Sequence, residues 1–212
     1  MAEHAIANAL RAEAAAYYER KLLAHGPTPR GVDWNSASSQ RLRFDELLRI
    51  IAPDAPPGTL IDYGCGYGAL ADHLAERHPD WRYCGFDPSP KMIEAARRMH
   101  TPEPQRSFTS DEATLQRAAY TVASGIFNVK FDHDDDVWTE YVFGTLDRLA
   151  ALSEAGFAFN VLTIHSDPDR KRRDLYYADP LRVFEHCRQR FSRRVAILHD
   201  YPLFEFTILV RG

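Results

Sequence analysis

Cysteine and long apolar runs are both scarce in this sequence. The three cysteines, Cys65, Cys84 and Cys187, lie far apart with no CxxC spacing. This argues against a zinc site and a disulfide framework, and it fits a reducing compartment. No stretch reaches the roughly 18 consecutive apolar residues of a transmembrane helix, and the first twenty residues lack an apolar signal core. We therefore expect a cytoplasmic protein with no membrane span and no metal ion.

An excess of basic charge is also missing. The formal net charge is −4, and acidic and basic residues are interspersed along the chain. Binding to a polyphosphate relies on Lys and Arg that replace counterions, so we expect no nucleic-acid partner. The one basic run, residues 170–173, is interpreted as a solvated loop. The 212 residues, 45% of them hydrophobic, suffice for one α/β domain with a single core.

The order of predicted elements indicates an α/β fold. The first 55 residues form two helical patterns, 5–23 and 38–51, joined by a turn-rich segment. After them, short apolar runs alternate with amphipathic stretches, which is typical of a parallel sheet with helices on both faces. The predicted strands are 59–63, 82–86, 106–109, 120–124, 157–164, 194–199 and 205–210. The predicted helices between them are 69–78, 91–99, a short 112–118, 138–155 and 180–191.

The last two predicted strands break this alternation. Only about five residues separate 194–199 from 205–210, too few for a crossover helix, so the two strands must run antiparallel. We therefore predict a Rossmann-like seven-stranded sheet with six parallel strands and one antiparallel C-terminal strand. Ordinary dinucleotide-binding sheets lack this reversed strand.

A glycine-rich turn follows the first predicted strand. Gly64, Gly66 and Gly68 stand after Asp62 and before a predicted helix. Glycines at this place let the chain turn sharply and let a ligand lie against the backbone. About twenty residues later, the second predicted strand ends in Asp87, whose carboxylate can accept hydrogen bonds from both hydroxyls of a ribose. The pattern predicts a nucleoside-binding site.

Two cofactor classes fit this turn. Gly64 and Gly66 followed by Ala69 satisfy the loose dinucleotide fingerprint, so an NAD(P)-dependent oxidoreductase stays open on the glycines alone. Asp62 favours the other class, because an acid beside a pyrophosphate would be repulsive. A cationic ligand, such as one with the ammonium and sulfonium of S-adenosylmethionine, explains Asp62 better. A third alternative is a noncatalytic nucleoside-binding protein that has the turn but has lost an acceptor pocket.

Residues 62–68 and Asp87 resemble motifs I and II of the class I S-adenosylmethionine-dependent methyltransferases. The likeness continues through Ser110 and Asp111, across residues 119–128 and to the reversed last strand. It implies S-adenosylmethionine as cofactor and methyl transfer to O, N or C of a small-molecule metabolite, as in a biosynthetic pathway. It also implies that residues 56–212 form the cofactor-binding domain, with residues 1–55 as a helical lid and substrate segment of the same structural domain.

The resemblance further implies roles for single residues. Asp62 is expected near the amino group of the cofactor, Asp87 on its ribose hydroxyls, and Arg43 of the lid on its carboxylate. Ser124 and Gly125 are expected to pass close to the sulfonium. The helix predicted after the third strand is short, which departs from the family pattern on the adenine side. The other expected cofactor contacts are Gly64, Cys65, Gly66 and Gly68 along the turn, Pro88 or Met92 on adenine, and Ser110 or Asp111 at the adenine amino group.

The acceptor side follows from the carboxyl ends of the predicted strands, where ligands of open parallel sheets sit. Asn128 follows the fourth strand, His165 the fifth and His199 the sixth, and these three are the catalytic candidates. The two histidines are candidate general bases, because a neutral imidazole accepts a proton near neutral pH. A base is needed only if the acceptor must lose a proton. For His199, stabilisation of the following turn is the alternative.

Aromatic residues supply candidate walls for an acceptor pocket. Tyr17, Trp34 and Tyr201 are the expected substrate contacts, although Tyr17 also fits an ordinary helix face. Asn128 lacks the aromatic and proline neighbours of the Asn-Pro-Pro-Tyr motif of nucleic-acid and protein amine methyltransferases. This favours a small-molecule acceptor. The identity of the acceptor and the oligomeric state, a homodimer included, stay open.

Overall fold

The computed structural model describes residues 2–212, and strands alternate with helices or 3-10 turns over residues 59–198. The chain divides into two compact units: Met1–Phe44 with Pro57–Gln116, and Asp45–Pro56 with Arg117–Gly212. The strand order in the sheet is β3-β2-β1-β4-β5-β7-β6, with six parallel strands and an antiparallel β7. This confirms the predicted fold class. The lid boundary at residue 55 stays a prediction.

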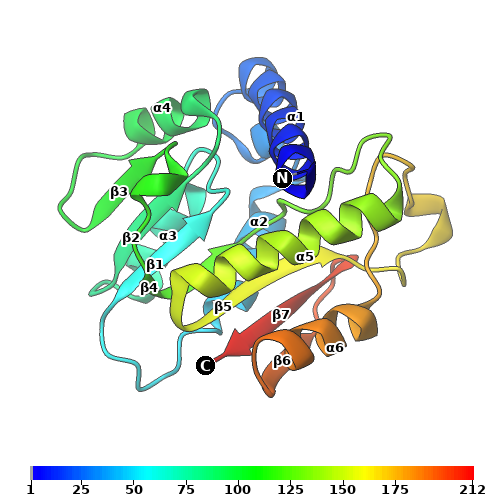
Figure 1. The fold of residues 1–212 in the computed structure, drawn as a ribbon. Coiled ribbons are helices and arrows are strands. Elements are labelled where there is room, and N and C mark those ends of the chain that lie inside the picture. Colours follow the sequence, from blue (N-terminus) through cyan, green and yellow to red (C-terminus); the bar gives the residue numbers. More distant parts are fainter. Residues whose placement is uncertain (1) are drawn as a thin grey trace. The chain divides into compact units, whose positions relative to one another are not determined.

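The first unit contains three parallel strands whose carboxyl ends are level. Tyr63 is in register with Phe86, and Phe86 with Thr109, so the three strands end together. Figure 1 shows them side by side, with α4 next to β3. The strands are β1 (Thr59–Tyr63), β2 (Arg82–Phe86) and β3 (Arg106–Thr109). The helices and 3-10 turns are α1 (Ala2–His25), η1 (Pro29–Val32), α2 (Ala37–Leu48, which ends in the second unit), α3 (Ala69–Arg77), α4 (Pro90–Met99) and η2 (Glu112–Thr114).

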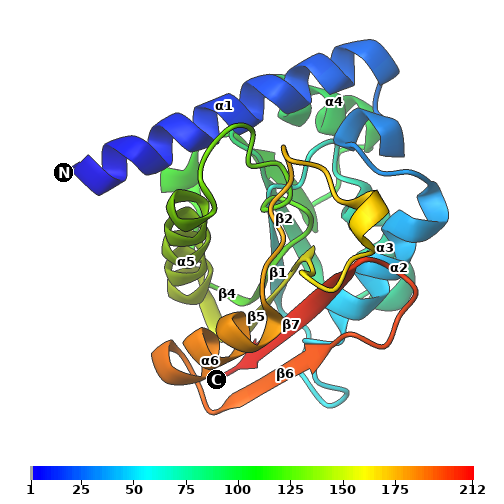
Figure 2. The same cartoon turned by 90° about the vertical axis from the view of Figure 1, so that its right-hand side faces the viewer.

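The second unit contains the reversed strand. β7 pairs antiparallel with both β5 and β6, and Figure 2 shows β6 and β7 lying against each other. The helix α5 packs on β4 and β5 through one apolar stripe of Trp138, Val142, Leu146 and Leu149, spaced three or four residues apart. The strands are β4 (Ala118–Ala123), β5 (Ser153–Leu162), β6 (Arg194–Leu198) and β7 (Glu205–Arg211). The helices are α5 (Asp135–Leu152), the turn η3 (Pro168–Arg170) and α6 (Pro180–Arg190).

The boundary between α5 and β5 differs from the predicted one. The pattern predicts a helix over 138–155, but α5 ends at Leu152 and residues 153–155 already belong to β5. Ser153 is extended (φ −103°, ψ 141°), and its hydroxyl donates to Leu149 O at 2.7 Å. At Gly156 (φ 153°) a Cβ would lie 2.3 Å from Val210 O of β7. Ser153 is in register with Ala118 of β4, and Ala155 O accepts from Gly212 N at 2.7 Å. Pairing with these two neighbours therefore holds extended a stretch that would favour helix by its own composition.

A second difference lies after β3. The predicted helix 112–118 is only the single turn η2, and β4 begins at Ala118 rather than at residue 120. Asp111 caps this turn through Oδ1, which accepts from Ala113 N at 3.0 Å, and the chain is extended again at Leu115. The predicted ranges of β1, β2 and β3 match the structure. Among the described residues, every helix is too short or too polar to cross a bilayer.

Candidate functional site

The glycine-rich turn has the tight geometry that its sequence predicts. Gly64, Gly66 and Gly68 all have positive φ angles, of 85°, 54° and 83°. A Cβ at Gly66 would lie 3.0 Å from a methyl carbon of Val32, and a Cβ at Gly68 would lie 2.7 Å from the ring of Phe108. Any larger residue here would be strained in its backbone and crowded by neighbours. The turn therefore brings bare backbone to the carboxyl end of β1.

Asp87 stands beside this turn at the end of β2. Its Oδ2 accepts from Gly66 N at 2.9 Å and its Oδ1 from Ser89 N at 2.9 Å. Burial raises the pKa of Asp87 to about 6, although the two amide hydrogen bonds lower it. The side chain is half-buried, and each carboxylate oxygen retains one acceptor position. The bare turn and this carboxylate fit a nucleoside with a free ribose diol, as in S-adenosylmethionine.

Asp62 lies deeper, on β1 itself. It is only 3% exposed, and its Oδ2 accepts a hydrogen bond of 2.6 Å from the hydroxyl of Tyr83. Burial raises the pKa of Asp62 to about 7, with a further rise from the charge of Asp87 and a partial offset from the Tyr83 hydrogen bond. A nearby cation would favour the ionised form. Its contact with a cofactor amino group stays a prediction. Tyr83 fixes the carboxyl group of Asp62. The sequence analysis assigned it no role, because a tyrosine within a predicted strand is typical of an ordinary core residue.

The other predicted cofactor positions of this unit differ in accessibility. Cys65 is 9% exposed, and burial raises the pKa of its thiol well above the usual value, so it stays protonated. Met92 is 1% exposed in the core, whereas Pro88 is half-buried, so Pro88 is the more accessible of the two adenine candidates. Ser110 and Asp111 are both exposed after β3. These assignments stay predictions.

The helix α1 is anchored to two segments that follow strands of the same unit. Arg11 pairs with Glu112 at 2.6 Å, just after the predicted adenine-side residues. Glu19 accepts from the Ser89 hydroxyl at 2.8 Å and pairs with Lys91 at 2.9 Å, just after Asp87. These anchors could not be predicted from the sequence, because their partners are distant in the chain.

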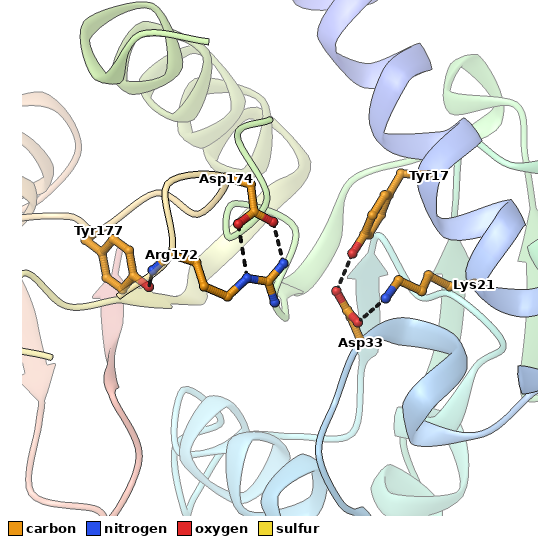
Figure 3. Close-up of polar contacts among 6 residues, drawn as sticks. All are labelled: Tyr17, Lys21, Asp33, Arg172, Asp174 and Tyr177. Atoms are coloured by element: carbon orange, nitrogen blue, oxygen red, sulfur yellow. Dashed lines mark hydrogen bonds and ion pairs between the residues drawn. The ribbon is translucent and has the colours of Figure 1, made fainter. Parts of the chain in front are cut away.

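A third anchor joins α1 to the segment after η1 (Figure 3). The Tyr17 hydroxyl donates to Asp33 Oδ2 at 2.5 Å, and Lys21 Nζ lies 2.8 Å from Asp33 Oδ1. Burial and the carboxylate raise the pKa of Tyr17, and the hydrogen bond to Asp33 raises the pKa of Lys21. Val32, next to Asp33, is the residue that lies over Gly66. Tyr17 therefore holds the segment that lies against the glycine-rich turn.

Trp34 and Arg43 form a stacked pair. The Arg43 guanidinium lies 3.9 Å from the centre of a Trp34 ring, a cation–π geometry, and Nη1 donates to Ser39 O at 2.9 Å. Arg43 is 7% exposed. The predicted contact of Arg43 with a cofactor carboxylate and that of Trp34 with substrate stay predictions. Either contact would have to be made beside this stack.

In the second unit, Ser124 and Gly125 form the turn that follows β4. Gly125 has a φ of 72°, and its amide donates to Asn160 Oδ1 at 2.8 Å. The Asn160 amide nitrogen donates to Ser124 Oγ at 3.3 Å. Asn160 was missed by the sequence analysis. Its signal was a polar residue inside the apolar run of the fifth predicted strand.

Asn128, three residues further on, carries an unsatisfied polar atom. Its side chain is 7% exposed, and its Oδ1 has no hydrogen-bond partner among the described residues. Its backbone is held, because Tyr176 N donates to Asn128 O at 2.8 Å. A buried carbonyl oxygen without a donor is costly, so a bound group that donates a hydrogen bond would be stabilised there.

The two candidate histidines lie together in the second unit. The rings of His165 and His199 have centres 6.2 Å apart, both side chains are exposed, and His199 also contacts the ring of Phe206. Tyr201 differs, since it is 8% exposed and its hydroxyl bonds the buried Thr207 Oγ1 at 2.9 Å. A pocket-wall role for Tyr201 stays a prediction.

The basic run belongs to the loop between β5 and α6. Arg172 forms a two-bond ion pair with Asp174, and its backbone amide donates to the Tyr177 hydroxyl at 3.0 Å (Figure 3). Residues 170–173 are exposed, in agreement with the solvated loop expected from the sequence. In the described part of the chain, no three His, Cys, Asp or Glu side chains are grouped so that they could hold a metal ion.

Comparisons with known proteins place this geometry in a family. A family model described as a methyltransferase domain matches residues 36–195. A Mycobacterium tuberculosis protein assigned as a methyltransferase is 47% identical over 157 residues, covering 74% of this chain and 95% of that protein. Trans-aconitate 2-methyltransferase of Streptomyces coelicolor is 39% identical over 82 residues, covering 32% of this chain and 27% of that enzyme.

Solved structures share the fold at low identity. Magnesium protoporphyrin IX methyltransferase from Synechocystis, with bound S-adenosylhomocysteine, gives a TM-score of 0.61 at 15% identity, over 82% of this chain and 83% of that one. N-methyltransferase NodS from Bradyrhizobium japonicum gives 0.60 at 13% identity, over 83% and 97%. The fold, the family model and the M. tuberculosis relative agree. The chain belongs to the class I S-adenosylmethionine-dependent methyltransferases, and S-adenosylmethionine is its cofactor.

Proposed function

We propose that this enzyme transfers the methyl group of S-adenosylmethionine to O, N or C of a small-molecule metabolite. Asp87 carries the proposal, because it is tied to the glycine-rich turn through Gly66 while each of its oxygens keeps an acceptor position. Relatives named for small-molecule acceptors, such as the trans-aconitate 2-methyltransferases, support the substrate class. They align with only about a third of this chain, so they do not identify the acceptor. The matched relatives give no support to a nicotinamide-dependent oxidoreductase or a noncatalytic binding protein.

Each unit has its own proposed cofactor contacts. In the first unit, Gly64, Gly66 and Gly68 would line the methionine and ribose portions, with Asp87 on the ribose hydroxyls. In the second unit, Ser124 and Gly125 would pass close to the sulfonium. S-adenosylmethionine supplies a methyl group on a cationic sulfur, and an in-line displacement needs donor and acceptor held in line with water excluded. The residues therefore act mainly by positioning.

The proposed acceptor side uses Asn128, His165 and His199. The buried Asn128 Oδ1 would accept a hydrogen bond from the acceptor and so orient it. His199 would remove a proton where the acceptor atom must lose one, with His165 as its neighbour. Both imidazoles are exposed, so either can exchange the proton with solvent.

A thermal-shift panel of S-adenosylmethionine, S-adenosylhomocysteine, NAD and NADP tests the proposal. A ligand that binds only the folded state stabilises it by about 2.7 kcal/mol at a hundredfold excess over its Kd. We expect both sulfur nucleosides to raise the melting temperature and both nicotinamide nucleotides to leave it unchanged. Stabilisation by NAD alone would overturn the proposal. An acceptor screen scored by S-adenosylhomocysteine release would then separate a catalyst from a binding protein.

Two further expectations belong to this proposal. We place the enzyme in the cytoplasm, without a nucleic-acid partner. We take a homodimer as the oligomeric state to test, by size-exclusion chromatography with light scattering. A single monomeric species at assay concentration would remove it.

A further inference from the structure

We propose that Asn160 is a positioning residue for methyl transfer, because its side chain fixes the turn of Ser124 and Gly125. This inference rests on the proposed function in one respect: it takes that turn to lie close to the sulfonium. Asn160 itself is fully buried, at 0% exposure, and so acts through the turn rather than by touching a ligand.

Asn160 lies within β5, where alternate side chains face opposite sides of the sheet. Its neighbours Phe159 and Val161 are buried apolar residues, as expected of a central strand covered on both faces. A leucine at position 160 would bury more apolar surface without a polar group to satisfy. The same leucine would leave the Gly125 amide without its acceptor, so the asparagine is explained by the turn it holds and not by the packing of β5.

Both ends of the Asn160 amide are used on one turn. Its carbonyl oxygen accepts from the Gly125 amide at 2.8 Å, and its nitrogen donates to Ser124 Oγ at 3.3 Å. Gly125 is in the left-handed region, with φ 72°, and is itself buried. Gly125 lies beyond the end of β4 at Ala123, and a buried amide there needs an acceptor. The asparagine supplies this acceptor and so fixes the position of the turn relative to β5.

The residue opposite Asn160 on β7 provides a matched control. Thr207 is in register with Asn160 and is equally buried, at 0% exposure. Its Oγ1 bonds the Tyr201 hydroxyl at 2.9 Å rather than the turn of Ser124 and Gly125. A Thr207→Val variant therefore loses a buried hydrogen bond at the same depth while leaving this turn intact.

The test compares Asn160→Leu, Asn160→Asp, Ser124→Ala and Thr207→Val with the wild type. S-adenosylhomocysteine affinity is measured by calorimetry well below each melting temperature, and Gly125 amide exchange by NMR. For Asn160→Leu we expect roughly tenfold weaker binding and fast exchange at Gly125, since one lost hydrogen bond and a loosened turn are worth about that much. Asn160→Asp keeps the acceptor for Gly125 and should bind within about threefold of wild type. Thr207→Val should lower the melting temperature with unchanged affinity.

Each outcome decides between the two proposals. Unchanged affinity in Asn160→Leu, alongside wild-type binding, overturns the role of Asn160 and leaves the proposed function standing. If the wild type itself does not bind S-adenosylhomocysteine, the proposed function fails, and Gly125 exchange still shows whether Asn160 fixes the turn. If Asn160→Leu does not fold, Asn160→Asp and Ser124→Ala carry the test. Slow Gly125 exchange in Asn160→Asp with wild-type affinity supports the inference, and fast exchange with wild-type affinity contradicts it.

Discussion

The two units of the molecule hold their predicted functional residues in different ways. In the first unit, Asp62 and Asp87 are fixed by hydrogen bonds from Tyr83, Gly66 and Ser89, and burial raises both of their pKa values. In the second unit, the candidate bases His165 and His199 are exposed side chains whose rings lie side by side. The predicted cofactor residues of the first unit are held in place by the fold itself, whereas the candidate bases of the second unit lie open to solvent.

This difference follows from the chemistry of each side. The same nucleoside always binds the cofactor side, so its backbone geometry and its carboxylates can be built in rigidly. Acceptors differ from enzyme to enzyme, so the residues that meet them need not follow a shared pattern. Substitutions on either side test this contrast.

His199→Asn tests the second unit and should have the largest effect. If His199 is the general base, turnover should fall by about a hundredfold or more, the usual scale for loss of such a group. Affinity for S-adenosylhomocysteine should hardly change, because the predicted cofactor contacts lie on other segments. Turnover with an identified acceptor and calorimetry on the same variant measure the two quantities. His25→Asn, an exposed histidine of α1, is the control. A lower melting temperature with normal turnover would assign His199 to the hairpin turn.

Asp87→Ala tests the first unit. Loss of charge-assisted hydrogen bonds to the ribose should weaken binding by about 2 to 3 kcal/mol, or roughly 30- to 150-fold in Kd. Calorimetry with S-adenosylhomocysteine measures the change. Asp80→Ala removes an exposed carboxylate from the same unit and should leave Kd unchanged. A Kd for Asp87→Ala within twofold of wild type would refute the ribose assignment.

Asp62 should make stability depend on pH in an unusual direction. Its pKa is about 7 in the folded protein, whereas an unfolded aspartate ionises near pH 4. Between these values only the unfolded state gives up the proton, so the free energy of unfolding should fall as pH rises. The contribution of Asp62 from about pH 5 to pH 7 is on the order of 2 kcal/mol. Urea unfolding across this range measures it.

The matched variant for this effect is Asp62→Asn. An asparagine keeps an oxygen that can accept a hydrogen bond from Tyr83, but it cannot ionise. The free energy of unfolding of the variant should therefore exceed that of wild type above pH 7 and vary less with pH. If the free energies of unfolding of the two proteins change equally with pH, the pKa of Asp62 is not raised in the folded protein.

Tyr17→Phe should have the smallest effect. It removes the hydrogen bond to Asp33 but leaves the Lys21 contact, so we expect a loss of about 1 kcal/mol in stability and a less than fivefold increase in Kd for S-adenosylhomocysteine. Tyr177→Phe removes a hydroxyl that accepts a backbone hydrogen bond in the second unit and should leave Kd unchanged. Equal effects of the two variants on Kd would show that the Asp33 anchor does not support the cofactor site.

Much of the fold could be predicted because its signals are local. Buried strands, the glycine turn and the short hairpin before β7 can be recognised from neighbouring residues, and they predicted the seven strands and the reversal of the last one. The end of α5 could not be predicted, because residues 153–155 favour helix and become strand only through backbone pairing with Ala118 of β4 and with Gly212. Tertiary contact overrides propensity there.

The candidate site was also only partly predictable from the sequence. Gly66, Asp62 and Asp87 were predicted because the glycine turn with Asp62 is a local pattern and an acid ends the next strand about twenty residues later. Tyr83 and Asn160, which hold Asp62 and the Ser124 turn, were not found, because each acts on a residue 21 or more positions away. Their side chains differ little from ordinary strand residues until the fold brings the partners together.

The three anchors of α1 have a mechanical consequence. Arg11 and Lys21 are ten residues apart on one helix, or about 15 Å at 1.5 Å per residue, and Glu19 lies between them. A continuous helix of this length is a stiff rod, so the segments that hold Glu112, Ser89 and Asp33 cannot shift independently. A displacement of one segment is carried along the rod to the others. Because ion pairs contribute to all three attachments, added salt weakens them together, and the whole assembly should loosen cooperatively as ionic strength rises.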